Sequence, residues 1–334
     1  MLESMHEPLK PVRKIGPLFV SERFKDMKDP CICFDGTTWH IFGSGGDTRP
    51  EVWQILHATA PHIEGPWTEV EPAKLRGADG PHVAAPSVVF DPEDRLFHMA
   101  VQKDFMSIGG DITYLASADG HTFTKMRTLV RPRGSSEAGL YDPQLSLIRG
   151  KKYLVYSGIP KRLVEDVPII PQPDVYLARS ITDQWSGPWK RIGKILDHED
   201  IAWHHNRREF PDYEWGIEGP QIVELPGGRM LLNATCFMEE GPRGTRQRVF
   251  FAVADNVDGP YQSLGPVLTD RSEEWESGEN GHASAWVEGD ELYLFYQARS
   301  ITHPIPVENR WYYGIAVYRV KDILEKAEAP IVAA

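Results

Sequence analysis

Acidic residues stand at corresponding points of a repeated sequence pattern. Asp29 and Asp142 each precede a proline, and Glu218 precedes a Gly-Pro pair. Carboxylates that converge in a partly buried place do not all ionise at their usual pKa, because like charges raise the pKa of one and leave that of another low. A pair divided in this way supplies one acid and one base at neutral pH, which hydrolysis of a glycosidic bond requires.

Each acid taken alone has a simpler interpretation. Proline fixes the backbone and removes a donor, and an Asp-Pro pair at the start of a strand is common in turns. Three acids in the same setting are harder to ascribe to turns, and His282 stands at the corresponding point of a fifth segment. We therefore expect Asp29, Asp142 and Glu218 to be catalytic.

Five segments carry these residues, and each consists of a β-rich run, a tight turn and a second β-rich run. Four of them continue with a third run, and three of these end in GPW or GPY. The five segments are DPCICFDGTTWHIFGSG from Asp29, APSVVFDPEDRLFHMAVQ from Ala85, DPQLSLIRGKKYLVYSG from Asp142, EGPQIVELPGGRMLLNATC from Glu218 and GHASAWVEGDELYLFYQAR from Gly281.

This repeat predicts an all-β fold, a five-bladed β-propeller with four-stranded antiparallel blades around a central channel. The units fill nearly all of the 334 residues, so we expect a single catalytic domain over 1–334. Its blades would begin near residues 29, 85, 142, 218 and 281. Residues 1–20 would help to close the ring and remove exposed edges. The start of each innermost strand lies at the channel mouth, where the acids would converge.

The amino-acid composition disfavours some classes of binding partner. The formal net charge of −12 disfavours nucleic acid and anionic membranes, so a neutral substrate is the simplest expectation. No apolar stretch is long enough to span a membrane, and the N-terminal residues lack the apolar core of a signal peptide. Cys31, Cys33 and Cys236 are a sparse, odd set, which favours a cytoplasmic location.

The KDP, YDP and EGP motifs at three blade starts resemble those of glycoside hydrolase family 43, whose clan also contains the family 32 fructosidases. The resemblance runs from about Asp29 to Val320. It implies a five-bladed propeller that hydrolyses arabinofuranosides or xylosides with inversion. It also implies that Asp29 is the general base, that Glu218 is the general acid, and that Asp142 tunes and orients Glu218. His282 would face a central water or calcium ion, so a structural Ca²⁺ is conceivable although no cofactor is required.

Departures from the family pattern concern Ser87, which stands where many relatives have Glu, and Lys28, which stands where fructosidases have Asn. The second departure favours inverting hydrolysis over retaining fructosyl transfer. Further candidates for sugar contact are basic or aromatic side chains, each of which is more often an ion-pair or core residue when taken singly. They are Trp53, Phe105, Trp203, Trp215, Arg246 and Arg299.

The sequence thus predicts an exo-acting, inverting glycosidase that removes terminal arabinofuranosyl or xylosyl units from a short neutral oligosaccharide. Two alternatives stay open. A phosphorylase or transferase on the same scaffold would need a basic pocket beside the base. A non-catalytic carbohydrate-binding propeller would bind sugar without turnover. The sequence leaves the oligomeric state open.

Overall fold

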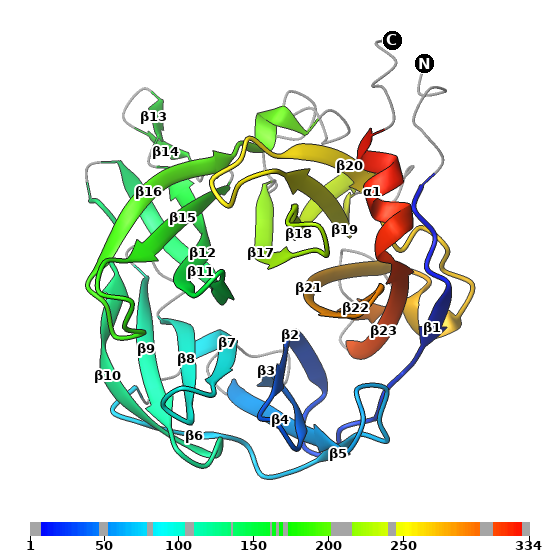
Figure 1. Ribbon diagram of the computed structural model, residues 1–334, viewed down its shortest axis with the longest axis horizontal. Coiled ribbons are helices and arrows are strands. Elements are labelled where there is room, and N and C mark those ends of the chain that lie inside the picture. Colours follow the sequence, from blue (N-terminus) through cyan, green and yellow to red (C-terminus); the bar gives the residue numbers. More distant parts are fainter. Residues whose placement is uncertain are drawn as a thin grey trace.

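The computed structural model describes residues 8–46, 53–78, 83–103, 110–134, 136–160, 162–164, 167–169, 173–201, 216–239, 245–300 and 310–328. Five antiparallel sheets stand around a central channel, as the sequence predicts (Figure 1). Their innermost strands are β2 (Asp26–Phe34), β7 (Val83–Asp91), β11 (Glu137–Ile148), β17 (Ile217–Glu224) and β21 (Glu279–Glu288).

The outer strands follow in chain order in four of the five blades. The first blade adds β3 (Trp39–Gly46), β4 (Gln54–Ala60) and β5 (Thr68–Glu69). The second adds β8 (Leu96–Lys103), β9 (Asp111–Ser117) and β10 (Thr122–Val130). The third adds β12 (Lys151–Pro160), β15 (Asp174–Ser180) and β16 (Trp189–Leu196), and the fourth adds β18 (Met230–Glu239), β19 (Thr245–Ala254) and β20 (Gln262–Pro266).

Two blades carry additions that the repeat does not predict. In the second blade, the short strand β6 (Lys74–Arg76) pairs in parallel with β10 and makes a fifth strand. Next to the third blade, β13 (Arg162–Val164) and β14 (Val167–Ile169) form a separate hairpin. Both additions lie outside the repeated runs, so the channel keeps its five-fold lining.

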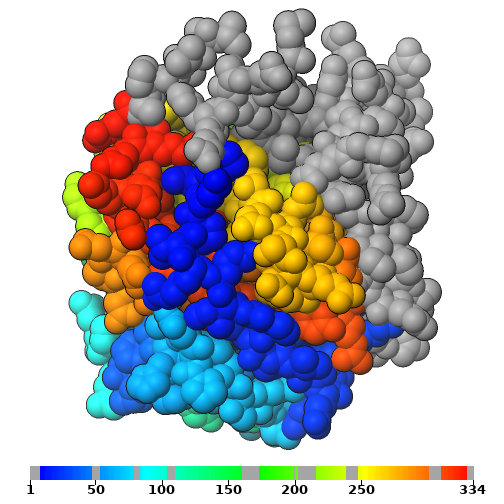
Figure 2. Space-filling view, turned by 90° about the vertical axis from the view of Figure 1, so that its right-hand side faces the viewer, coloured from blue at the N-terminus to red at the C-terminus, as the bar shows by residue number. Residues whose placement is uncertain are grey.

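The fifth blade joins the two ends of the chain. It contains β22 (Glu291–Arg299), β23 (Tyr312–Arg319) and, as its outermost strand, β1 (Arg13–Ile15). Strand β1 pairs antiparallel with β23, and Arg13 also forms an ion pair with Glu291 at 2.8 Å. Figure 2 shows the N-terminal segment crossing the outside of this blade. Residues 13–15 of the segment expected to close the ring thus pair with the last blade.

Helical structure is minor among the described residues. The α-helix α1 (Val320–Glu328) follows β23, and the short 3-10 turns η2 (His198–Asp200) and η4 (Glu274–Glu276) lie in connections. No described helix has the length and apolarity needed to cross a bilayer.

Apolar side chains fill the spaces between neighbouring blades. Between the first two blades, Cys31 and Phe42 pack with Val88, Phe97 and other buried side chains. All three cysteines are buried and unbridged, and burial raises the pKa of the Cys31 thiol to about 11. Interblade burial of this kind holds each innermost strand in a fixed position, which the channel mouth requires.

Two buried histidines in the first blade make stability depend on pH. His57 stacks on Phe42, and its Nε2 lies 3.0 Å from Nδ1 of His40. Burial, helped by the nearby His40, lowers the pKa of His57 to about 3. Below pH 6.5, His57 binds a proton in the unfolded chain but stays neutral in the native chain. The free energy of unfolding therefore falls as the pH falls toward 3.

We expect the His57 effect to cost about 2–3 kcal/mol between pH 7 and pH 4.5, since each unit contributes about 1.4 kcal/mol. Urea unfolding at both pH values measures it. The variant His57→Gln removes the titrating group, so its stability should fall less over the same interval. An equal loss in both proteins would show that His57 does not carry the effect.

Candidate active site

Each innermost strand carries an irregularity at the same point near the channel mouth. At that point the pairing with the second strand skips a residue, as at a β-bulge, in all five blades. The residue at the bulge has a left-handed backbone, which side chains rarely adopt and which often marks a functional position. These residues are Asp29, Ala85, Asp142, Gly219 and His282, with φ of 54°, 47°, 48°, 55° and 28°.

The backbone N–H group of each bulge residue donates a hydrogen bond to a side chain of the neighbouring blade. The N–H of Asp29 donates to Oε1 of Gln297 at 2.7 Å, and that of Asp142 donates to Oε1 of Gln102 at 2.8 Å. In the fourth blade, the N–H of Gly219 donates to the Asp142 carboxylate at 3.0 Å. Ala85 and His282 donate likewise to Ser44 and Thr235. The five bulges therefore form one continuous ring.

Glu218 departs from the expected equivalence of the three acids. The bulge position of the fourth blade belongs to Gly219, and Glu218 comes one residue earlier in β17. A Cβ on Gly219 would lie 3.1 Å from the ring of His282, so a side chain at this bulge would require the imidazole to shift. The acid of the fourth blade thus enters the site from a different point of its strand.

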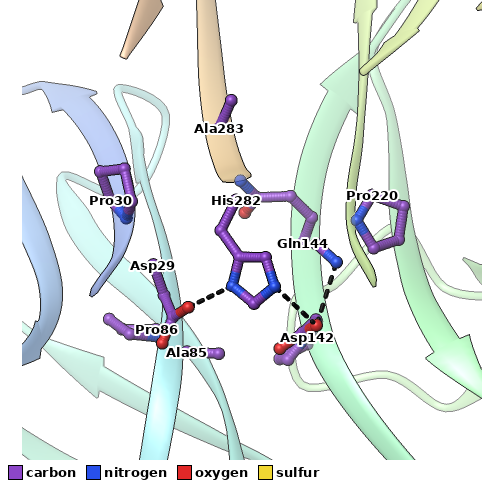
Figure 3. A pocket seen from close by; sticks show the side chains of 11 residues that line it. Asp29, Pro30, Ala85, Pro86, Asp142, Gln144, Pro220, His282 and Ala283 are labelled. Atoms are coloured by element: carbon purple, nitrogen blue, oxygen red, sulfur yellow. Dashed lines mark hydrogen bonds and ion pairs between the residues drawn. The ribbon is translucent and has the colours of Figure 1, made fainter. Parts of the chain in front are cut away.

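His282 brings the three acids together. Its Nδ1 is bonded to the Asp29 carboxylate on one side, and its Nε2 lies 3.3 Å from Glu218 and 3.7 Å from Asp142 on the other. Figure 3 shows the imidazole between Asp29 and Asp142. Oxygens of Asp142 and Glu218 and a nitrogen of His282 all lie within 4.8 Å of one another. The sequence-predicted catalytic residues and His282 therefore form one cluster.

The cluster separates the pKa values of its members. Burial alone would raise the pKa of Asp29, but the charge of His282 and its hydrogen bond lower it below its usual range. Burial, together with the charges of Glu218 and Asp29, raises the pKa of Asp142 to about 7. Although burial opposes it, the charges of Asp142 and Asp29 raise the pKa of His282 well above its usual value. Near neutral pH, the site thus holds an ionised Asp29, a charged imidazole and a partly protonated Asp142.

A pocket of about 350 Å³ opens above this cluster. Asp29, Asp142, Glu218 and His282 form part of its lining, and the rings of Trp53 and Tyr141 stand in its wall. Below, the channel narrows to a cavity of about 30 Å³ between the bulges, which has room for little more than one water molecule. The arrangement offers a solvent-sized space beside a carboxylate and a larger pocket for a ligand.

The other predicted sugar contacts differ in their placement. Ser87 is buried, and its hydroxyl accepts the N–H of Leu145 from the next blade at 2.7 Å. Arg299 is buried and forms an ion pair with Glu279. Because a buried, engaged side chain cannot meet a sugar in the pocket, the structure gives these two predictions no support. Phe105, Trp203 and Trp215 lie outside the described residues, as does the side chain of Arg246.

Several residues that line the pocket are not identified by the sequence patterns. Gln102, Gln247 and Gln297 come from second or third strands of their blades, where no motif marks them. Lys28 and Tyr141 also line the pocket, and both directly precede an acid in the KDP and YDP motifs. Their position in those motifs is the signal that could have identified them.

Comparison with known proteins finds matches in structure and none in sequence. No protein family and no curated protein matches the chain. A thermostable family-43 glycoside hydrolase superposes with a TM-score of 0.65 at 17% identity, covering 88% of this chain and 89% of that one. The chain has the fold of a family-43 glycoside hydrolase.

Two further structures share the propeller fold. The α-L-arabinofuranosidase PaAbf62A from Podospora anserina, solved with cellotriose, has a TM-score of 0.62 at 17% identity and covers 94% of this chain and 95% of its own. An endo-arabinase from Bacteroides thetaiotaomicron has a TM-score of 0.61 at 16% identity, with 94% and 97% covered. At such identities the likeness concerns the fold, so the chemistry has to be argued from the site.

Proposed function

We propose that this protein is a glycoside hydrolase that removes a terminal sugar unit with inversion. The observation that carries the proposal is the cluster itself, in which Asp29 and Glu218 contact opposite nitrogens of one buried imidazole at the floor of a pocket. Glycoside hydrolysis needs two carboxyl groups with different tasks on either side of the bond to be cleaved.

Asp29 acts as the general base in this proposal. Its pKa is lowered by His282, so its carboxylate is ionised at neutral pH and can accept a proton from water. The imidazole holds that carboxylate through Nδ1 and fixes its orientation. The attacking water needs a space beside that carboxylate on the same side as the sugar, and the pocket that Asp29 lines offers one.

Glu218 acts as the general acid that protonates the leaving oxygen. Asp142, whose pKa is raised to about 7, holds a proton for part of the time at neutral pH. Because an oxygen of Asp142 lies within 4.8 Å of one of Glu218, Asp142 is placed to return a proton to Glu218 after each turnover. This proton return goes beyond the tuning and orienting role that the resemblance implies for Asp142.

The placement of the two carboxyls on opposite nitrogens of His282 supports inversion. Retaining enzymes hold the pair about 5–5.5 Å apart, whereas inverting enzymes leave about 6.5–9.5 Å for a water molecule. Here a whole imidazole ring stands between the oxygens of Asp29 and Glu218 that it binds. That spacing favours attack by water over direct attack by a carboxylate.

The pocket supports action on a chain end. Its volume of about 350 Å³ is at the lower end of the range for small-molecule sites, which suits a terminal unit better than the middle of a polymer. Structures with this fold include arabinofuranosidases, an arabinanase and a xylanase. Arabinofuranosyl and xylosyl units are therefore the first candidates for the unit removed.

A cation at the channel centre is compatible with the donor set. Asp142, Glu218 and Nε2 of His282 lie close enough together to share an ion, and calcium prefers several oxygen ligands that water could complete. Such an ion would supply positive charge beside the acids. It would require the neutral form of His282, in which Nδ1–H still donates to Asp29.

Assays on a panel of 4-nitrophenyl glycosides test the proposal, in buffers with and without inorganic phosphate. We expect turnover of at least one pentoside, independent of phosphate, and proton NMR should show that the first sugar released has the inverted anomeric configuration. Release of the retained anomer would contradict inversion. Dependence on phosphate would indicate a phosphorylase, and sugar binding without turnover of any glycoside or oligosaccharide would indicate a binding propeller.

A further inference from the structure

A lysine stands in the wall of the pocket beside the acids. The Lys28 ammonium lies 5.4 Å from the ring centre of Trp53 and 5.3 Å from that of Trp311. Contacts of this kind hold an ammonium in place without neutralising its charge. Lys28 forms no ion pair with any carboxylate of the described residues, and it lines the pocket together with Trp53 and Glu218. The wall therefore presents a positive charge.

The charged groups nearest to Lys28 form no direct ion pair with it among the described residues. Asp26 lies on the same strand, and burial raises its pKa even though the charge of Lys28 opposes this. The Arg299 guanidinium also lies over Trp311, 4.4 Å from the ring centre, and is paired with Glu279. Asp29 already bonds the charged His282. Among the described residues no carboxylate pairs directly with Lys28, although its charge acts on both Asp26 and Asp29.

Amide groups add hydrogen-bond donors to the same pocket. Oε1 of Gln102 accepts the N–H of Asp142, and Oε1 of Gln247 accepts a hydrogen bond from Nε2 of Gln297 at 3.4 Å. An amide whose oxygen is occupied offers its NH₂ group to a ligand. Gln102 and Gln247 both line the pocket. Acidic groups thus form the floor, while a cation and amide donors form part of the wall.

We propose that Lys28 and these amides bind an oxyanion of the substrate, so that the enzyme acts on a glycoside carrying a carboxylate near the cleaved bond, as a uronic acid does. The inference rests on the proposed hydrolase function and narrows its substrate. It also modifies the expectation of a neutral substrate, because the net charge of −12 describes the whole chain while one carboxylate meets only the local charge. Free phosphate offers the same oxyanion chemistry from another source.

Two nitrophenyl glycosides that differ in one group make the sharpest test. A β-D-xyloside is a β-D-glucuronide without its carboxylate, so the ratio of their kcat/KM values reports recognition of that group. We expect the wild type to favour the glucuronide by about 10–100-fold, as for a hydrogen bond to a charged group. Lys28→Met should bring the ratio near one, and Lys28→Arg should largely keep it. Lys151→Met, an exposed lysine paired with Asp183, is the control and should leave the ratio as in the wild type.

Other outcomes would overturn the assignment. If Lys28→Met lowers both rates equally and shifts the acid limb of the pH profile, Lys28 acts through Asp29 instead. If phosphate accelerates cleavage of both glycosides only when Lys28 is present, the anion is a free co-substrate.

Calorimetric titration with free D-glucuronate and D-xylose needs no turnover, so it separates this inference from the proposed function. Glucuronate binding that requires Lys28 would support the anion site even if no glycoside were cleaved. Equal binding of both sugars by the wild type would refute the site even if pentosides were cleaved.

Discussion

Replacing Glu218 with glutamine is expected to lower kcat by about 10²–10⁴-fold on an oligosaccharide, since this is the usual contribution of a general acid. Glutamine keeps the shape of the side chain and cannot donate a proton to the leaving oxygen. The loss should be much smaller on a nitrophenyl glycoside, because nitrophenolate leaves with little protonation. Steady-state kinetics on both substrates measure the difference.

A variant on the same strand controls for general effects of the Glu218 replacement. Glu224 also lies on β17 and forms an ion pair with Arg149 at 2.7 Å, away from the acids. Glu224→Gln should therefore keep the kcat of the wild type on both substrates. If Glu218→Gln loses the same factor on both substrates, Glu218 does not protonate the leaving group.

Replacing Asp29 with asparagine is expected to reduce kcat by a similar factor, about 10²–10⁴, but on both kinds of substrate alike. The base acts on water, so its loss is indifferent to the leaving group. The variant also removes the partner of Nδ1 of His282, and the charge of Asp29 is one of the groups that raise the pKa of His282. That pKa should therefore fall.

Two measurements distinguish a lost base from a lost fold. Thermal unfolding should show that Asp29→Asn remains folded, and azide, a small nucleophile that needs no base, should restore part of the turnover. NMR titration of His282 should show its lowered pKa. A folded variant that retains wild-type kcat would rule out Asp29 as the base.

Much of the fold follows from the sequence because the blades repeat. Tight-turn residues between β-rich runs mark each hairpin, and the proline after each acid locates an innermost strand, although β2, β11 and β17 all begin before the acid. The offset of Glu218 could not be found in this way, because an alignment of motifs does not reveal which residue of Glu218-Gly219 adopts the left-handed backbone. That choice depends on the ring of His282 from another blade.

The walls of the pocket are less predictable than its floor. Gln102 and Gln247 lie in strand runs that resemble any other, and they reach the pocket because antiparallel pairing returns the chain to the channel mouth. Arg299 looks like a candidate because it follows the histidine motif closely in sequence. Strand pairing in the fifth blade places Arg299 directly opposite Glu279, and the two side chains form a buried ion pair.

The ring of bulges has a consequence for how such a site can change. Its members are held by their backbone N–H groups, which every amino acid except proline possesses. The left-handed backbone disfavours branched side chains at these positions, and the Asp142 carboxylate is itself the acceptor that holds Gly219. At the other bulges the holding contact does not depend on the side chain of the bulge residue. Here two bulges carry acids, one carries an imidazole and one is glycine, while Ala85 places a methyl group at the fifth. The side chains at these bulges, and with them the chemistry of the site, can therefore be replaced one at a time without changing the propeller fold.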